Sequence, residues 1–196
     1  MLYEGSISGA FGSCAGGHTA IRTDEGTATQ STKPLARLRG RMPSLPDAVG
    51  EFLRGKRIAV AGVSRSGMSA ANAIFRKLRD SGYEAFPVNP AAGEVEGVRS
   101  FPDLLSIPGS VDGVVIATHP KVSIDLVRQC VNCGIGRVWF HRSFGQGSVS
   151  DDAVRECQVR GIDCIVGGCP LMYCDPVDGA HRCIRWWLRW WRRVPG

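Results

Sequence analysis

The stretch from Arg57 to Pro90 constrains the fold more than any other part of this 196-residue chain. It opens with an apolar run at 57–62, passes through the turn Val63–Gly67, and continues into a segment with apolar side chains at helical spacing. Ser81-Gly82 ends that segment, and a second apolar run follows at 84–88. This order of strand, glycine turn, helix and strand predicts a nucleotide-binding unit, in which a phosphate meets the helix N-terminus. The predicted buried face of the helix consists of Ala71, Ile74, Phe75 and Leu78.

The same alternation of strands and helices continues through the rest of the chain. Further strands are expected at 112–118, 137–140 and 162–166, and Phe101–Leu105 is expected to form one helical turn. Strands that alternate with helices of this length predict an α/β fold with a doubly wound, mostly parallel five-stranded sheet and helices on both faces. Helices are expected at 47–53, at 123–133 with Ile124, Val127 and Val131 facing inward, and at 148–160.

We expect three parts along the chain. Residues 1–45 are rich in Gly, Ser, Thr and Ala and lack a sustained period, so they are predicted to be a disordered N-terminal extension. Met42 is an alternative start of translation, which leaves open whether residues 1–41 are translated. Residues 46–168 are predicted to form the Rossmann-like domain, and residues 169–196 a C-terminal extension.

The net charge of +6 lies at the ends of the chain. Pro46–His181 holds fourteen basic and fifteen acidic residues, whereas Arg182–Gly196 holds five arginines and no acid. A basic groove across the fold is therefore not indicated, and a nucleic-acid partner is not expected. No apolar run approaches the roughly 20 residues of a membrane span. Without a secretory signal, the eight cysteines are read as reduced thiols of a cytoplasmic protein.

The C-terminal extension is predicted to contain a basic, Trp-rich amphipathic helix at 182–193, with tryptophans on one face and arginines on the other. Such a helix suits an anionic membrane surface or a partner groove. We favour packing against its own sheet or a second subunit, which leaves a homodimer open. Just before it, Cys169, Cys174, His181 and Cys183 do not have the spacing of a zinc site, so no metal is predicted.

The ligand of a doubly wound sheet lies beyond the carboxyl-terminal ends of the strands. Gly62 would let the backbone approach a phosphate, while Ser64 and Arg65 would add hydroxyl and guanidinium donors. The predicted cofactor-binding residues are Gly62, Val63, Ser64, Arg65 and Gly67 after the first strand, Asn89 and Pro90 after the second, and Ala117, Thr118, His119, Pro120 and Lys121 after the third.

The end of the second strand bears on which nucleotide is bound. Dinucleotide enzymes place an acid there, about 20 residues past the glycines, to hold the ribose hydroxyls. This chain has Asn89 at that place, and it lacks the Gly-Lys-Ser/Thr of nucleotide triphosphatases. NAD is disfavoured more than NADP, whose 2′-phosphate Arg65 could contact.

Five segments carry a resemblance to a known family. They are Lys56–Arg65, Gly82–Pro90, Val95–Gly97, Val111–Ile116 and Gly161–Val166. Together they resemble the small stand-alone CoA-binding proteins, whose domain is similar to the CoA-binding domain of the succinyl-CoA synthetase alpha subunit. The resemblance implies CoA or acyl-CoA cradled by the glycine turn, with Asn89-Pro90 and Ala117–Lys121 beside its phosphates and adenosine. The chain departs from the family pattern at Thr118-His119-Pro120, where many relatives have Pro-Pro.

Taken together, these features predict a non-catalytic CoA or acyl-CoA binding protein. No arrangement of nucleophile, base and orienting acid is visible, so no catalytic residue is assigned. Two alternatives stay open at this point. One is an NAD(P)-binding oxidoreductase, and the other is an interaction protein that has kept the fold but lost the ligand.

Overall fold

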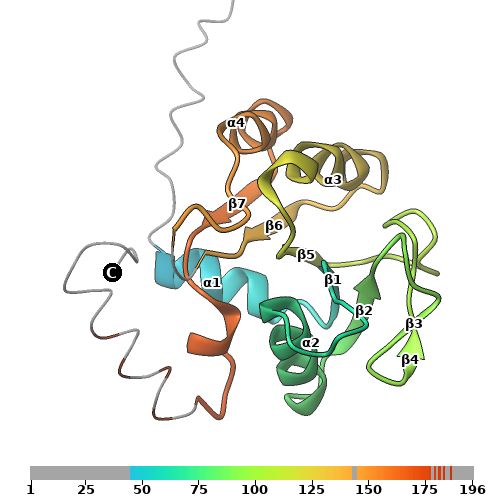
Figure 1. The fold of residues 1–196 in the computed structure, drawn as a ribbon. Coiled ribbons are helices and arrows are strands. Elements are labelled where there is room, and N and C mark those ends of the chain that lie inside the picture. The colour runs from blue at the N-terminus through green and yellow to red at the C-terminus, as the bar shows by residue number, and fades with distance from the viewer. Residues whose placement is uncertain are drawn as a thin grey trace, which may run out of the picture. The chain divides into compact units, whose positions relative to one another are not determined.

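A computed structural model describes residues 45–142, 145–177, 179, 181, 183 and 186. They contain a five-stranded sheet of order β2-β1-β5-β6-β7 and a two-stranded hairpin, β3-β4 (Figure 1). Every neighbouring pair in the larger sheet is parallel, which confirms the doubly wound α/β fold. The strands are β1 (Arg57–Ala61), β2 (Glu84–Val88), β3 (Glu94–Val95), β4 (Val98–Arg99), β5 (Gly113–Ile116), β6 (Arg137–Phe140) and β7 (Asp163–Val166).

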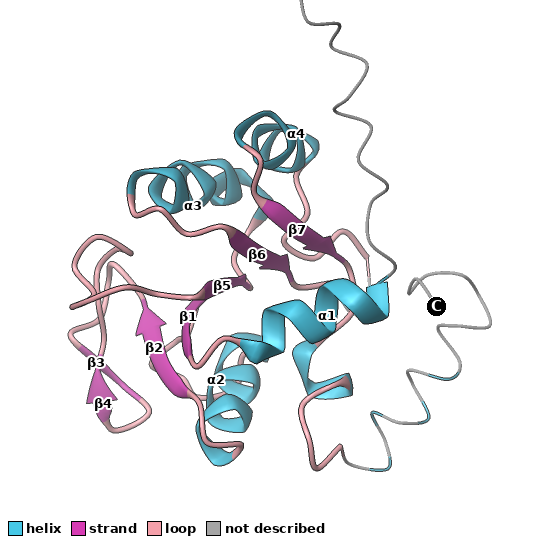
Figure 2. Cartoon of the chain, turned by 180° about the vertical axis from the view of Figure 1, so that it is seen from behind, coloured by secondary structure: helices cyan, strands magenta, loops and turns pink. Residues whose placement is uncertain are grey.

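Helices cover both faces of the sheet. Figures 1 and 2 show α1 (Leu45–Arg54) and α2 (Ala70–Asp80) on one side, and α3 (Pro120–Asn132) and α4 (Asp151–Arg160) on the other. Successive side chains of a strand point to opposite faces. The core is accordingly split into two hydrophobic clusters, one under each pair of helices. In β1, Ile58 and Val60 belong to the cluster under α1 and α2, and Ala59 and Ala61 to the other.

The strand order reverses between β1 and β5. The chain leaves β1 through α2 to reach β2 on one side, and leaves β5 through α3 to reach β6 on the other. Because α2 and α3 lie on opposite faces of the sheet, the loops after β1 and β5 diverge at this point (Figure 1). Such a switch point is where doubly wound sheets bind ligands.

Helix α2 has the buried face that the sequence predicts. Ala71, Ile74, Phe75 and Leu78 are all buried, and the side chain of Ser69 caps the helix by accepting a hydrogen bond from the Asn72 amide (3.2 Å). A serine at the N-cap stabilises a helix in this way. The helix ends at Ser81, and Gly82 follows with a φ of 82°.

The predicted bounds and inward face of α3 are partly wrong. The helix begins at Pro120 rather than at residue 123, because His119 serves as N-cap and proline suits the first helical position. The buried side chains are those of Ser123, Leu126, Val127 and Cys130, whereas Ile124 and Val131 are only partly buried. The Ser123 hydroxyl donates to the Ser148 carbonyl (2.7 Å), which turns that face of the helix inward.

Three other segments differ from expectation. Helix α4 begins at Asp151, three residues later than predicted, with Ser150 at its N-cap. Residues 101–105 form no helical turn, because Phe101 pairs with Val88 at the edge of the sheet. The segment at 94–99, where no strand was predicted, forms the β3-β4 hairpin. After β7, the chain forms the short 3-10 helix Pro170–Met172, labelled η2.

Some predictions fall on residues outside those that the structure describes. The N-terminal extension is one, apart from Leu45, with which α1 begins, and the basic helix at 182–193 is another, apart from Cys183 and Trp186. The proposed domain boundaries stay predictions. None of the described helices has the length and apolar character that crossing a bilayer requires. Among the described cysteines no disulfide is formed.

Candidate functional site

The loops that follow β1, β2 and β5 are tied together by backbone and side-chain hydrogen bonds. The Gly62 amide donates to the carbonyl of Val88 at the end of β2 (3.1 Å), and Asn89 Nδ2 donates to the Val63 carbonyl (2.8 Å). On the other side, the Ala117 amide donates to the carbonyl of the last residue of β1 (3.0 Å). The structure thus brings the starts of all three predicted loops to one edge of the sheet, at the switch point.

Gly62 lies where the exits of β1 and β5 are still packed against each other, before the two loops diverge. Its φ is 102°, and a Cβ atom built on it would lie 2.6 Å from the Ala117 carbonyl oxygen and 3.2 Å from Thr118 Cγ2. A side chain there would collide with backbone, which cannot move aside as a flexible side chain can. Close packing of the two exits therefore requires this glycine, in addition to the predicted approach to phosphate.

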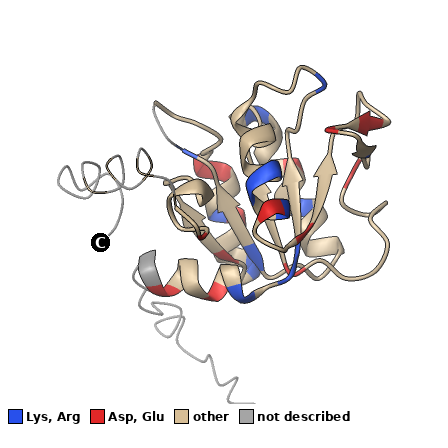
Figure 3. Ribbon diagram, turned by 90° about the horizontal axis from the view of Figure 1, so that it is seen from below, with Lys and Arg blue, Asp and Glu red and all other residues tan. Residues whose placement is uncertain are grey.

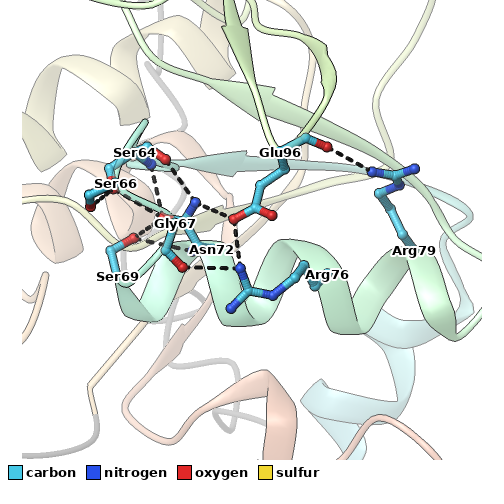
Figure 4. Close-up of polar contacts among 8 residues, drawn as sticks. All are labelled: Ser64, Ser66, Gly67, Ser69, Asn72, Arg76, Arg79 and Glu96. Atoms are coloured by element: carbon cyan, nitrogen blue, oxygen red, sulfur yellow. Dashed lines mark hydrogen bonds and ion pairs between the residues drawn. The ribbon is translucent and has the colours of Figure 1, made fainter.

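The turn between β1 and α2 is held by Asn72, a fully buried residue in the first turn of α2 (Figure 4). Asn72 Oδ1 accepts from the Ser64 amide (3.0 Å) and from the Ser69 hydroxyl, and Nδ2 donates to the Ser64 carbonyl (2.8 Å). The Ser64 and Ser66 hydroxyls are hydrogen-bonded to each other (2.8 Å). The backbone of Ser64 is therefore saturated within the protein, and its hydroxyl group, which bonds to Ser66 and Asn72, can meet a ligand only by exchanging one of these bonds.

Other amides of the same turn have no partner among the described residues. They belong to Arg65, Ser66, Met68 and Ser69, and to the first two residues of α2. Unpaired amides at a helix N-terminus, together with the helix dipole, favour an anion. Arg65 is exposed and joins no ion pair within the described ranges. This turn can therefore supply donors and a positive charge to a phosphate group.

An ion pair beside the turn, between the largely buried Glu96 and the exposed Arg76, was not predicted from the sequence. Glu96 Oε1 accepts from Asn72 Nδ2 (2.5 Å) and from Arg76 Nη1 (2.7 Å), and Arg76 Nη1 also donates to the Gly67 carbonyl (3.0 Å). Glu96 lies in the β3-β4 hairpin, 24 residues from Asn72 in the chain. The one available signal was the polar Asn72 among the apolar positions of the helix face.

Asn89 uses its side chain inside the protein. Oδ1 accepts from the Ala91 amide (2.8 Å), as in an Asx turn, while Nδ2 holds the Val63 carbonyl. A carboxylate at this position could not donate that second bond. Pro90, the next predicted residue, is exposed. The amide therefore joins the exits of β1 and β2, a role that the aspartate or glutamate of dinucleotide enzymes could not fill.

The loop after β5 forms the other side of the site. His119 Nδ1 accepts from the Lys121 amide (3.3 Å) as the N-cap of α3, and Thr118 Oγ1 donates weakly to the His119 carbonyl (3.5 Å). The Lys121 side chain is exposed and forms no ion pair in the part of the chain that the structure describes. Arg65 thus lies in the loop that leads to α2, and Lys121 lies in the first turn of α3, on the opposite face of the sheet.

Other ionisable groups lie near this edge. Glu96 is paired with Arg76. Burial lowers the pKa of His141, which follows β6, below its ordinary value, so its imidazole is neutral at pH 7. Arg142, the next residue, is exposed and donates to the Gly145 carbonyl (2.6 Å). Over the described residues as a whole, acidic and basic side chains are interspersed (Figure 3). Arg65, Lys121 and Arg142 are therefore cations without an ion-pair partner among the described residues.

Comparison with known proteins shows the same architecture in small proteins and in parts of larger ones. The chain is 28% identical over 127 residues to the uncharacterized protein YneT of Bacillus subtilis, which covers 65% of this chain and 91% of YneT. It is 30% identical over 94 residues to the ADP-forming acetate–CoA ligase II of Archaeoglobus fulgidus. That second match spans 47% of this chain but only 14% of the ligase.

A solved structure of a hypothetical protein from Pyrococcus horikoshii OT3 is similar, with a TM-score of 0.60 and 28% identity over 65% of this chain and 87% of that one. The profile of a family described as the CoA binding domain matches residues 56–175, which is more than half of the chain and includes every predicted site residue. The chain therefore belongs to the CoA binding domain family.

Proposed function

We propose that this protein binds CoA or acyl-CoA at the carboxyl-terminal ends of β1, β2 and β5, and that it performs no chemistry on the ligand. One observation carries the proposal. In a chain of the CoA binding domain family, the exits of β1 and β5 diverge at the switch point, beside unpaired amides and two cations, Arg65 and Lys121, that form no ion pair among the described residues. CoA carries a diphosphate and a 3′-phosphate, which are the groups that such donors bind.

Most of the predicted residues have a part in this proposal. Gly62, the Ser64 hydroxyl and Arg65 would meet phosphate, and Lys121 would add a second cation from the first turn of α3. Asn89 and Pro90 would lie on the adenosine side, with Thr118 and His119 along the other wall. The hydrogen bonds of Asn89 indicate that it acts mainly by fixing the shape of its loop.

The non-catalytic part of the proposal is supported by how the polar groups at this edge are used. The Ser64 hydroxyl bonds to Ser66 and Asn72, neither of which is a base. His119 Nδ1 holds a backbone amide. Among the described residues of the three loops, no hydroxyl or thiol is hydrogen-bonded to an imidazole ring or a carboxylate that could activate it, since the Thr118 hydroxyl reaches only the backbone carbonyl of His119. The relative with a known activity, a ligase, extends far beyond the segment that this chain matches.

Isothermal titration with CoA, acetyl-CoA and NADPH tests the proposal. We expect binding of CoA and acetyl-CoA, and none of NADPH. Arg65→Ala and Lys121→Ala should each weaken CoA binding by about tenfold, as expected for loss of one charge-assisted contact. Arg155→Ala is a matched control, because Arg155 lies on α4 and pairs only with Asp152. Absence of CoA binding, or equal affinities for all three variants, would contradict the proposal.

We also propose that the protein is cytoplasmic and that its partner is a small-molecule ligand. The absence of disulfides among the described cysteines supports that location. A homodimer, and contact of residues 182–193 with a membrane surface, stay predictions of the sequence.

A further inference from the structure

The turn of the β3-β4 hairpin contains Glu96, a residue type that is unfavourable at that position of a hairpin turn. Glu96 and Gly97 link the two strands with φ values of 52° and 70°. Two-residue links with positive φ at both positions prefer Asn, Asp or Gly at the first position. A glutamate there is strained. Because its side chain is only 15% exposed, the reason for a glutamate lies in what that side chain contacts.

The Glu96 carboxylate contacts two residues of α2, and each of them holds one end of the glycine turn (Figure 4). Asn72, whose Nδ2 donates to Glu96, holds the amide and the carbonyl of Ser64. Arg76, which pairs with Glu96, also donates to the Gly67 carbonyl. Ser64 and Gly67 therefore depend on two side chains that converge on one carboxylate oxygen.

The carboxylate also favours the observed orientation of the Asn72 amide. A carboxylate can only accept hydrogen bonds, so Asn72 must present Nδ2 to it. Oδ1 then faces the Ser64 amide, an orientation that the Ser64 amide and carbonyl also favour. Without Glu96, the buried Asn72 loses one acceptor and one of the groups that fix its orientation, and Arg76 loses its anionic partner. Both ends of the turn would then be held more loosely.

We propose that Glu96 is a positioning residue, which keeps the Ser64–Gly67 turn in the form that receives the phosphate of the ligand. This inference rests on the proposed function. Glu96 contacts no ligand and acts through Asn72 and Arg76. A turn that is already ordered spares the ligand the cost of ordering it, which is how preorganisation raises affinity.

Titration of CoA into a set of hairpin variants tests this inference. Glu96→Ala should weaken CoA binding by about tenfold or more, the range expected when a hydrogen bond to a charged group is lost. Glu96→Gln keeps an oxygen that can accept from Asn72, and should recover part of that loss. Glu94→Ala is the matched control, because Glu94 is an exposed glutamate of the same hairpin and its side chain forms no hydrogen bond or ion pair among the described residues. It should bind CoA as the wild type does.

Amide hydrogen exchange of the ligand-free variants separates positioning from general destabilisation. Glu96→Ala should speed exchange at Ser64 while leaving Val60, in the centre of β1, protected as in the wild type. Exchange at Ser64 that matches the wild type, or that rises in step with Val60, would overturn the inference. So would equal CoA affinities for Glu96→Ala and Glu94→Ala. If the wild type itself binds no CoA, the proposed function fails, and the exchange comparison still decides whether Glu96 holds the turn.

Discussion

At Gly62, both the fold and the proposed site require a residue without a side chain. Gly62→Ala adds a methyl group 2.6 Å from the Ala117 carbonyl oxygen, at a φ of 102°. We expect a loss of roughly 2–5 kcal/mol in the free energy of unfolding, the sum of backbone strain and overpacking. Urea denaturation of the purified variant measures it.

Gly134→Ala provides the control for that prediction. Gly134 has a φ of 67°, but a Cβ atom there would meet no other atom within 4 Å. This variant should lose only the backbone term, about 1–2 kcal/mol. If both variants lost the same stability, the close approach of the β1 and β5 exits would not be what requires Gly62.

At the level of single residues, the sequence predicted which side chains lie at the strand ends, but not the contacts that shape their loops. The positions of Gly62, Asn89 and Lys121 follow from strand ends, which apolar runs reveal. The partner of Asn72 does not, because Glu96 reaches it only after the hairpin has folded back over α2. A contact between residues far apart in the chain leaves no periodic signal in either segment. The roles of the predicted residues in binding a ligand stay predictions.

The Asp112 carboxylate links the starts of strands β1 and β5 through hydrogen bonds. Asp112 Oδ2 accepts from the Lys56 amide (2.8 Å) and the Arg57 amide (2.9 Å), and these two bonds hold the pKa of Asp112 below its ordinary value. A carboxyl group whose pKa is lowered by folding stabilises the native state above its unfolded pKa. That contribution is lost as the pH falls through the unfolded pKa toward the folded one.

Asp112→Asn should therefore cost roughly 1–2 kcal/mol at pH 7, because two hydrogen bonds lose their charge. The difference from the wild type should shrink as the pH is lowered below about 4, because the wild-type carboxyl group becomes protonated first in the unfolded state and then, at its lowered pKa, in the native state. Urea unfolding between pH 2.5 and 7 measures both effects. Asp125→Asn is the control, since Asp125 is exposed on α3 and pairs only with Arg128. A difference between Asp112→Asn and the wild type that did not depend on pH would contradict this account.

Helices and strands were predictable where their apolar pattern is long. They were less predictable where a single capping residue or a tertiary contact determines the bounds of the element. All five strands of the main sheet are near the expected ranges, because parallel strands buried on both faces form continuous apolar runs. The start of α3 was misplaced because Pro120 can either end a strand or begin a helix. Residues 94–95 and 98–99 are too short to show a strand pattern, so the hairpin was not recognised.

At the scale of the whole molecule, one side of the sheet is completed by the chain that follows its last strand. Trp139 in β6 is fully buried, and its ring packs against Phe52 of α1 (5.4 Å between centroids) and Tyr173 (5.9 Å). Its Nε1 donates to the Gly167 carbonyl (3.0 Å). The side chain of Met172 lies in the same cluster and is 1% exposed. The segment after β7 thus shares a core with α1 and α2, and the predicted boundary at residue 168 can be tested through it.

Met172→Ala should lower the free energy of unfolding by about 2–4 kcal/mol, because it leaves a cavity in that shared core. Met68→Ala is the same substitution at a side chain that is 90% exposed, and should change the stability by no more than about 0.5 kcal/mol. Thermal and urea unfolding of the full chain compare the two variants. If Met172→Ala lowered the free energy of unfolding as little as Met68→Ala does, the segment after β7 would not contribute to the folded domain, and the predicted boundary at 168 would be supported. If it is costly and unfolding remains a single transition, the folding unit extends at least to Met172, because the sheet depends on that segment to cover one of its faces.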